Sequence, residues 1–114
     1  MDRDWHTITC VIHCPSGVIL REVEEAAAKE VDPAHIVTRT LHFFSAEAEM
    51  ESYRLADYFE SVELLPDEPN NKLRLTFHTR QGVDSHWKFL IATVLRSIGN
   101  RFAGVSVEFP RQST

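Results

Sequence analysis

The segment from Lys72 to Phe109 constrains the fold more than any other part of the chain, because two hydrophobic periodicities follow each other in it. Apolar and polar residues alternate from Leu73 to His78, as in a strand with one buried face. An apolar stripe at spacings of three and four follows, as in an amphipathic helix: Trp87, Leu90, Ile91, Val94, Leu95, Ile98 and Phe102. Alternation returns after Gly104. The segment therefore predicts a strand, a helix and a second strand.

Length and composition indicate one domain. The 114 residues are 43% hydrophobic and 25% charged, which is sufficient for a hydrophobic core without a disulfide framework or a structural metal. No apolar run reaches the ~20 residues that a membrane-spanning helix needs, and the charged N-terminus lacks the apolar segment of a signal peptide. We predict a single α+β domain over residues 1–114 in the cytoplasm, without a cofactor or membrane contact.

The two cysteines agree with a reducing compartment. If residues 7–14 form a strand, Cys10 and Cys14 lie on one face, roughly 13 Å apart at a rise of ~3.3 Å per residue. That separation is too large for a disulfide between them. We expect two free thiols in the core, and an intermolecular bridge is the alternative.

The segment before residue 72 adds five elements to the prediction. Strand-like alternation covers residues 5–14, a helix rich in Ala and Glu covers 18–31, and a second strand covers 36–44. A helix over 46–60 with Ser45 as its cap and a short strand over 62–65 complete the order. Without the 46–60 helix, this is the split βαβ arrangement. We predict a ferredoxin-like plait with an extra helix inserted between the second and third main strands.

In such a plait the helices cover one face of an antiparallel sheet and leave the other open. The open face is predicted to collect Thr7, Thr9, Val11, His13, Thr38, Thr40, His42, Arg74, Thr76, His78, Arg80, Ser106 and Glu108. It is either a solvated surface or an interface with a partner or a second copy of the chain. Nucleic acid is disfavoured because the face has no aromatic side chain for base stacking. A metal is disfavoured because the three histidines come from different strands.

Charge is distributed unevenly along the chain. The net charge is −5, yet residues 45–68 carry eight acidic residues against Arg54, and residues 72–101 carry six basic residues against Asp84. An acidic, solvated helix near a basic one is the simplest interpretation. The alternative is an acidic surface that attracts a basic protein partner. Free nucleic acid is a poor partner for this net charge.

One loop suggests enzymatic chemistry. Cys14 is expected between the end of a strand and a helix N-terminus, where the helix dipole favours a nucleophilic thiolate. The run from His13 to Arg21 resembles the His-Cys-x5-Arg loop of the cysteine-dependent phosphatases. The resemblance implies Cys14 as the nucleophile and Arg21 as the anion clamp, with His13 beside them. In this chain six residues rather than five separate Cys14 from Arg21, and Glu22 follows the arginine.

We predict a non-catalytic binding protein, such as an inhibitor, an immunity-type protein or a regulatory subunit, that occludes or scaffolds a macromolecular partner. The predicted partner-binding residues are Glu47, Glu49, Glu51, His13, His42, Arg74, His78 and Arg80. Two alternatives remain open. One is a small enzyme that uses Cys14, His13 and Arg21, and the other is a small-ligand regulatory module that dimerises through its sheet.

Overall fold

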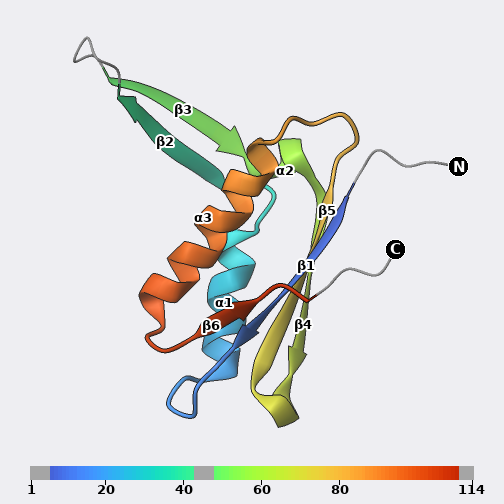
Figure 1. Ribbon diagram of the computed structural model, residues 1–114, viewed down its shortest axis with the longest axis vertical. Coiled ribbons are helices and arrows are strands. Elements are labelled where there is room, and N and C mark those ends of the chain that lie inside the picture. Colours follow the sequence, from blue (N-terminus) through green and yellow to red (C-terminus); the bar gives the residue numbers. More distant parts are fainter. Residues whose placement is uncertain (1–5, 43–47, 111–114) are drawn as a thin grey trace, which may run out of the picture.

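The chain forms a mixed α+β structure around a four-stranded antiparallel sheet (Figure 1), and a computed structural model describes residues 6–42 and 48–110 of it. The elements in chain order are β1 (Thr7–His13), α1 (Leu20–Glu30), β2 (Ile36–His42), β3 (Ala48–Arg54), α2 (Leu55–Tyr58), β4 (Phe59–Asp67), the 3-10 turn η1 (Glu68–Asn70), β5 (Lys72–Thr79), α3 (His86–Arg101) and β6 (Ser106–Glu108). The sheet has the strand order β4-β5-β1-β6, and β2 and β3 form a separate hairpin.

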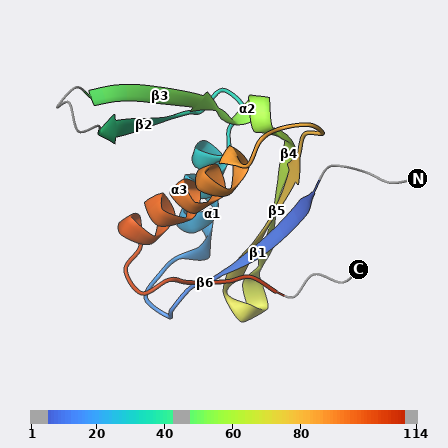
Figure 2. The ribbon, with the colours of Figure 1, turned by 45° about the horizontal axis from the view of Figure 1, so that its top comes forward.

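The core lies between one face of the sheet and the helices α1 and α3, which both cover that face (Figure 2). Leu73, Leu75 and Phe77 of β5 are completely buried, because alternate residues of a strand point to the same side of the sheet. The apolar stripe of α3 packs onto them, with Leu90 fully buried and Ile98 almost so. The alternating strand and the amphipathic helix predicted for residues 72–102 are therefore confirmed.

The connection between β4 and β5 forms a turn at one end of the sheet. The residues from Pro66 to Asn71 are rich in turn formers, and they contain the last two residues of β4 and η1. Asn71 then adopts a left-handed conformation with φ of 52°, which asparagine tolerates better than most residues. This turn places Glu68 and the ring of Pro69 beside the last residues of β4 and the first residues of β5.

The prediction for residues 36–67 is wrong in two respects. The described part of the predicted 46–60 helix forms β3, the four-residue α2 and the start of β4. The predicted second main strand, residues 36–44, does not join the sheet, because its described part pairs with β3 as the hairpin. The second main strand along the chain is instead β4, which is nine residues long where a short strand over 62–65 was expected. The four-stranded antiparallel sheet with helices on one face remains.

Tertiary packing explains why helix propensity failed in this segment. Glu, Ala, Met and Leu are strong helix formers, and they dominate residues 46–60. The buried residues of the described part are Tyr53, Leu55 and Phe59, which contact the core from a strand, a single helical turn and a second strand. Burial of these side chains outweighs a propensity difference of at most about 0.7 kcal/mol per ordinary residue.

The β2–β3 hairpin stands out from the rest of the molecule (Figures 1 and 2). Its inner face carries Val37 and Tyr53, which are opposite each other and buried. Its outer face carries Ile36 and Met50, which are 54% and 69% exposed. The hairpin is therefore attached to the body by one face and is open on the other.

None of the helices in the described residues is long and apolar enough to cross a membrane.

Candidate functional site

The face of the sheet that the helices leave uncovered carries three of the predicted site residues, His13, Arg74 and His78. The strand register places His13 opposite Lys72 and His78 opposite Thr7. Since the two ends of that register are six residues apart, the two histidines lie roughly 20 Å from each other along the sheet. They cannot share a metal ion, and the described residues contain no group of three or more potential ligands.

Each of these two histidines bonds to a glutamate on the neighbouring edge strand. His13 Nε2 lies 2.7 Å from Glu108 Oε1 on β6, and His78 Nε2 lies 2.6 Å from Glu63 Oε2 on β4. Both contacts run from one of the two central strands, β1 and β5, to an outer strand. They therefore connect the edges of the sheet to its centre, which is a structural role for both histidines in the isolated protein.

The prediction that Thr38, Thr40 and His42 lie on this face is wrong. All three belong to β2, which pairs with β3 and not with the main sheet. Thr38 Oγ1 lies 3.1 Å from Ser52 Oγ across the hairpin. His42 pairs with Ala48 through its backbone position, and its side chain lies outside the described part. The polar face of the main sheet consequently contains two of the three predicted histidines.

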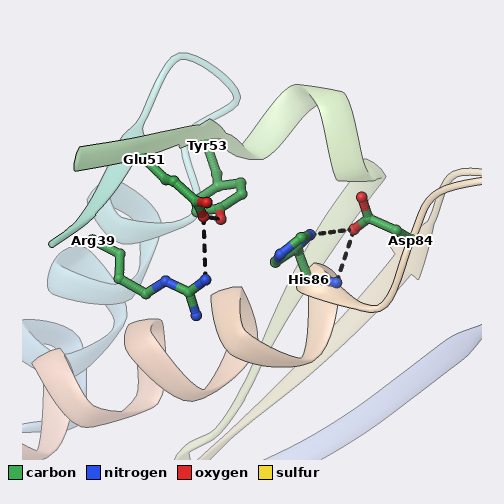
Figure 3. Close-up of polar contacts among 5 residues, drawn as sticks. All are labelled: Arg39, Glu51, Tyr53, Asp84 and His86. Atoms are coloured by element: carbon green, nitrogen blue, oxygen red, sulfur yellow. Dashed lines mark hydrogen bonds and ion pairs between the residues drawn. The ribbon is translucent and has the colours of Figure 1, made fainter. Parts of the chain in front are cut away.

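A second polar site lies where the hairpin rests on the N-terminal end of α3. Figure 3 shows this hairpin base cluster, which consists of Arg39, Glu51, Tyr53, Asp84 and His86. Arg39 Nη2 donates to Glu51 Oε2 at 3.1 Å, and the Tyr53 hydroxyl donates to the same oxygen. On the helix side, His86 Nδ1 and the His86 backbone nitrogen lie 2.7 Å and 2.9 Å from Asp84 Oδ1. Asp84 thus binds a free backbone N–H group at the start of the helix.

Aromatic contacts join the two halves of the hairpin base cluster. The ring centroids of Tyr53 and His86 are 4.9 Å apart, with the planes inclined by 32°. The Arg39 guanidinium carbon lies 4.9 Å from the ring centroid of Phe89 in α3, within the range of a cation–π contact. These contacts make the cluster the point at which the hairpin is fastened to the helix.

The hairpin base cluster and Tyr58, whose ring lies beside His86, favour ionised carboxylates and protonated tyrosines. The hydrogen bond from Tyr53 lowers the pKa of Glu51, and Arg39 acts in the same direction. The backbone N–H of His86 lowers the pKa of Asp84. The bond to Glu51 raises the pKa of Tyr53, and burial raises the pKa of Tyr58. All four groups keep their ordinary neutral-pH charge states more firmly than usual, which suits a fixed contact rather than proton transfer.

The acidic residues predicted to bind a partner have different positions. Glu51 points toward α3, and its carboxylate is already bonded to Arg39 and Tyr53. Glu49 pairs with Leu41 through its backbone position in β3, and its side chain lies outside the described part. Glu47 lies outside the described residues. The Arg80 guanidinium leaves the open face, because its Nε donates to the carbonyl of Ala56 at 2.5 Å.

The loop of the enzyme alternative, from His13 to Arg21, contains a thiol whose pKa is raised and not lowered. Burial raises the pKa of Cys14 and raises that of Cys10 to about 12, whereas a nucleophilic cysteine needs a lowered pKa. Asn71 Nδ2 donates to the carbonyl of Cys14 at 2.9 Å, so the loop is bonded to the β4–β5 turn. Arg21 lines a hollow that also contains Glu24 and Glu68 and does not include Cys14. This arrangement gives the phosphatase-like mechanism no support.

Sequence reasoning missed Arg39, Tyr53 and His86 of the hairpin base cluster. The pairing of β2 with β3 brings Arg39 and Tyr53 together, and no local pattern indicates that pairing. Asp84 stands just before the apolar stripe of α3 in the sequence, where a helix cap is typical, and it accepts the His86 N–H group. Of the five residues of the cluster, Glu51 is the one that the sequence analysis includes among the predicted partner-binding residues.

Comparisons with known proteins assign no family to this chain. No family model, no curated protein and no solved structure matches it. A functional proposal therefore has to rest on the residues and their geometry.

Proposed function

We propose that this protein is a non-catalytic binding protein of the inhibitor, immunity or regulatory-subunit type, and that it holds a protein partner through the β2–β3 hairpin. We further propose that the body is a ferredoxin-like plait, with the hairpin inserted between α1 and the second main strand. The strand order β4-β5-β1-β6 supports this, because removal of the hairpin and the short α2 leaves the split βαβ order of elements. A cytoplasmic location is proposed from the two free cysteines.

The observation that carries the proposal is a projecting hairpin whose strands have open outer edges in the described structure. Leu55 donates its backbone N–H to the carbonyl of His35 at 3.0 Å, which identifies this pair as hydrogen-bonded. Hydrogen-bonded and non-hydrogen-bonded pairs alternate along an antiparallel ladder. Thr38 and Thr40 are therefore in non-hydrogen-bonded pairs, and their backbone N–H and C=O groups point outward from β2. Ser52 and Met50 do the same from β3.

Such edges are the surface that an extended strand of another protein uses for main-chain pairing. Proteins usually cover or shorten free edges because they promote association. The hairpin packs against α3 by its inner face, which supplies the stability that an isolated two-stranded hairpin lacks, and its outer face and edges stay accessible to a partner. The net charge of −5 favours a basic partner. A second copy of this chain, which carries the same negative net charge, is the alternative partner.

Proline substitutions at outward-pointing positions test the proposal. Thr38→Pro and Ser52→Pro each remove one outward N–H donor and the side-chain contact between Thr38 and Ser52, and they leave the backbone hydrogen bonds within the hairpin intact. Thr38→Val and Ser52→Ala are the matched controls, because they change the side chain and keep the donor. Thermal unfolding followed by circular dichroism verifies that all four variants fold.

The readout is quantitative capture of proteins from the native host, together with light scattering to detect self-association. We expect one proline variant to lose the captured partner or the self-association while its matched control retains it. If both proline variants retain every interaction of the wild-type chain, the hairpin edges are not the binding surface.

A further inference from the structure

A groove of about 380 Å³ opens on the uncovered face of the sheet, at the end where β4 passes through η1 into β5. Its apolar part is formed by Val11, Leu65, Pro66 and Pro69. Val11 is only 5% exposed, whereas Leu65 is 61% exposed. The groove thus has a closed apolar floor and an apolar wall that the protein itself leaves uncovered. Its volume is at the lower end of the range for small-molecule sites, which is roughly 300–1,000 Å³.

Charged side chains of both signs line the same groove. Lys72 and Arg74 come from β5, whereas Asp67 and Glu68 come from the end of β4 and from η1. In the described part of the chain, neither Lys72 nor Arg74 forms an ion pair or a side-chain hydrogen bond. Two cations and two carboxylates therefore surround one apolar surface.

The register explains why Arg74 has no carboxylate partner. Its direct neighbours across the strands are Leu65 and Val11, which are both apolar. The carboxylate of Glu63 on β4 is bonded to His78, and that of Glu108 on β6 is bonded to His13. Asp67 accepts a hydrogen bond from Asn70 Nδ2 at 3.0 Å. The guanidinium of Arg74 is thus available to an anion from solution, next to exposed apolar surface.

We infer that this groove binds a free α-amino acid with an aliphatic side chain. The ligand carboxylate pairs with Arg74 and Lys72, its ammonium group pairs with Asp67 and Glu68, and its side chain covers Leu65 and the prolines. A zwitterion matches both signs of charge in the groove, whereas a simple carboxylate meets the two acidic residues and a simple amine meets the two basic ones. The groove shares no residue with the β2–β3 hairpin, so this inference does not depend on the proposed function.

Titrations of the full chain with four related probes test the inference. The probes are L-leucine, 4-methylpentanoate without the ammonium group, 3-methylbutylamine without the carboxylate, and N-acetyl-leucinamide without either charge. Amide NMR shifts locate each probe, and calorimetry measures its affinity. We expect leucine to shift the amides of residues 65–74 and to bind at least about tenfold more tightly than the other probes, because each of them leaves the basic pair, the acidic pair or both pairs of charges in the groove without a partner.

Three variants assign the contacts. Arg74→Gln and Asp67→Asn should each weaken leucine binding by about tenfold, since each removes one charge-assisted hydrogen bond. Arg96→Gln is the matched control, because Arg96 is an exposed arginine of α3 and does not line the groove. The inference is overturned if leucine leaves residues 65–74 unshifted, if either singly charged analogue binds as tightly as leucine, or if Arg96→Gln weakens binding as much as Arg74→Gln does.

Discussion

At the scale of single residues, Glu51 and Asp84 are expected to contribute to the pH dependence of stability. Both have a lowered pKa in the folded state, so their contribution to stability is complete above the unfolded value of about 4 and is lost as the pH falls through the folded value. We expect Glu51→Gln to be less stable than the wild type at neutral pH and to approach it in acid.

Urea unfolding at neutral and acidic pH measures this effect, with Glu25→Gln as the control. Glu25 is an exposed residue of α1 that lies outside the hairpin base cluster. A stability difference between Glu51→Gln and the wild type that stays constant at every pH would contradict the assignment, because it would show that the carboxylate charge makes no contribution.

Also at the residue scale, the thiols distinguish a binding protein from an enzyme. Burial raises the pKa of both cysteines, which lowers the thiolate fraction that reacts with thiol reagents. In the folded protein at neutral pH, we expect Cys14 to react more slowly than a free thiol and Cys10 to react only after unfolding. A Cys10→Ala variant assigns the observed rate to Cys14. Rapid alkylation of Cys14 in the folded variant would revive the mechanism with Cys14, His13 and Arg21.

At the scale of elements, Tyr53 controls how firmly the β2–β3 hairpin is attached to α3. Tyr53→Phe keeps the ring contact with His86 and removes the hydroxyl group that binds Glu51. Amide hydrogen exchange should become roughly fivefold faster in β2, because loss of one hydrogen bond makes local opening easier. Amides of β1 and β5 should keep their protection.

Thr40→Ala is the control for that experiment, since Thr40 is exposed on the outer face of the hairpin. Equal acceleration of exchange in β2 and β5 after Tyr53→Phe would show that the hairpin and the sheet open together. The cluster would then be part of the global core and not a local attachment.

Elements with one continuous buried face could be predicted from the sequence. The alternation of Leu73, Leu75 and Phe77 and the stripe of α3 follow from burial against a single neighbour, and burial leaves a regular period in the sequence. The same reasoning placed His13, Arg74 and His78 together on the open face. The hairpin could not be predicted, because Val37 and Tyr53 are buried by pairing across sixteen positions and leave no local period. The same lack of a local period explains why His42 was wrongly predicted on the open face of the main sheet, since it belongs to β2 of the hairpin.

At the scale of the whole molecule, the burial of each side chain predicts how much its removal lowers the free energy of unfolding. Phe77 is fully buried in β5, one of the two central strands of the sheet, with its ring centroid 5.4 Å from that of Phe59. Phe77→Ala should cost about 3–5 kcal/mol of unfolding free energy, because it removes apolar contacts and leaves a cavity. Urea unfolding measures the loss, and Met50→Ala on the exposed face of the hairpin is the control. Similar losses for the two variants would contradict this description of the core.

Because β2 and β3 form a sheet of their own, we predict that the hairpin can be removed without loss of the four-stranded sheet. His35 and Leu55 form a hydrogen-bonded pair at the base of the hairpin, so a two-residue Asn-Gly turn can join them in place of residues 36–54. The main core retains Leu55, Phe59 and the residues of β1, β5 and α3. We expect the shortened chain to fold with lower stability, to lose the protein partner and to keep leucine binding in the groove. Dispersed amide NMR spectra, partner capture and calorimetry measure the three results. If the shortened chain is unfolded, the hairpin is part of the folding unit. If the shortened chain still binds the partner, the interaction belongs to the open face of the sheet, where His13 and His78 lie.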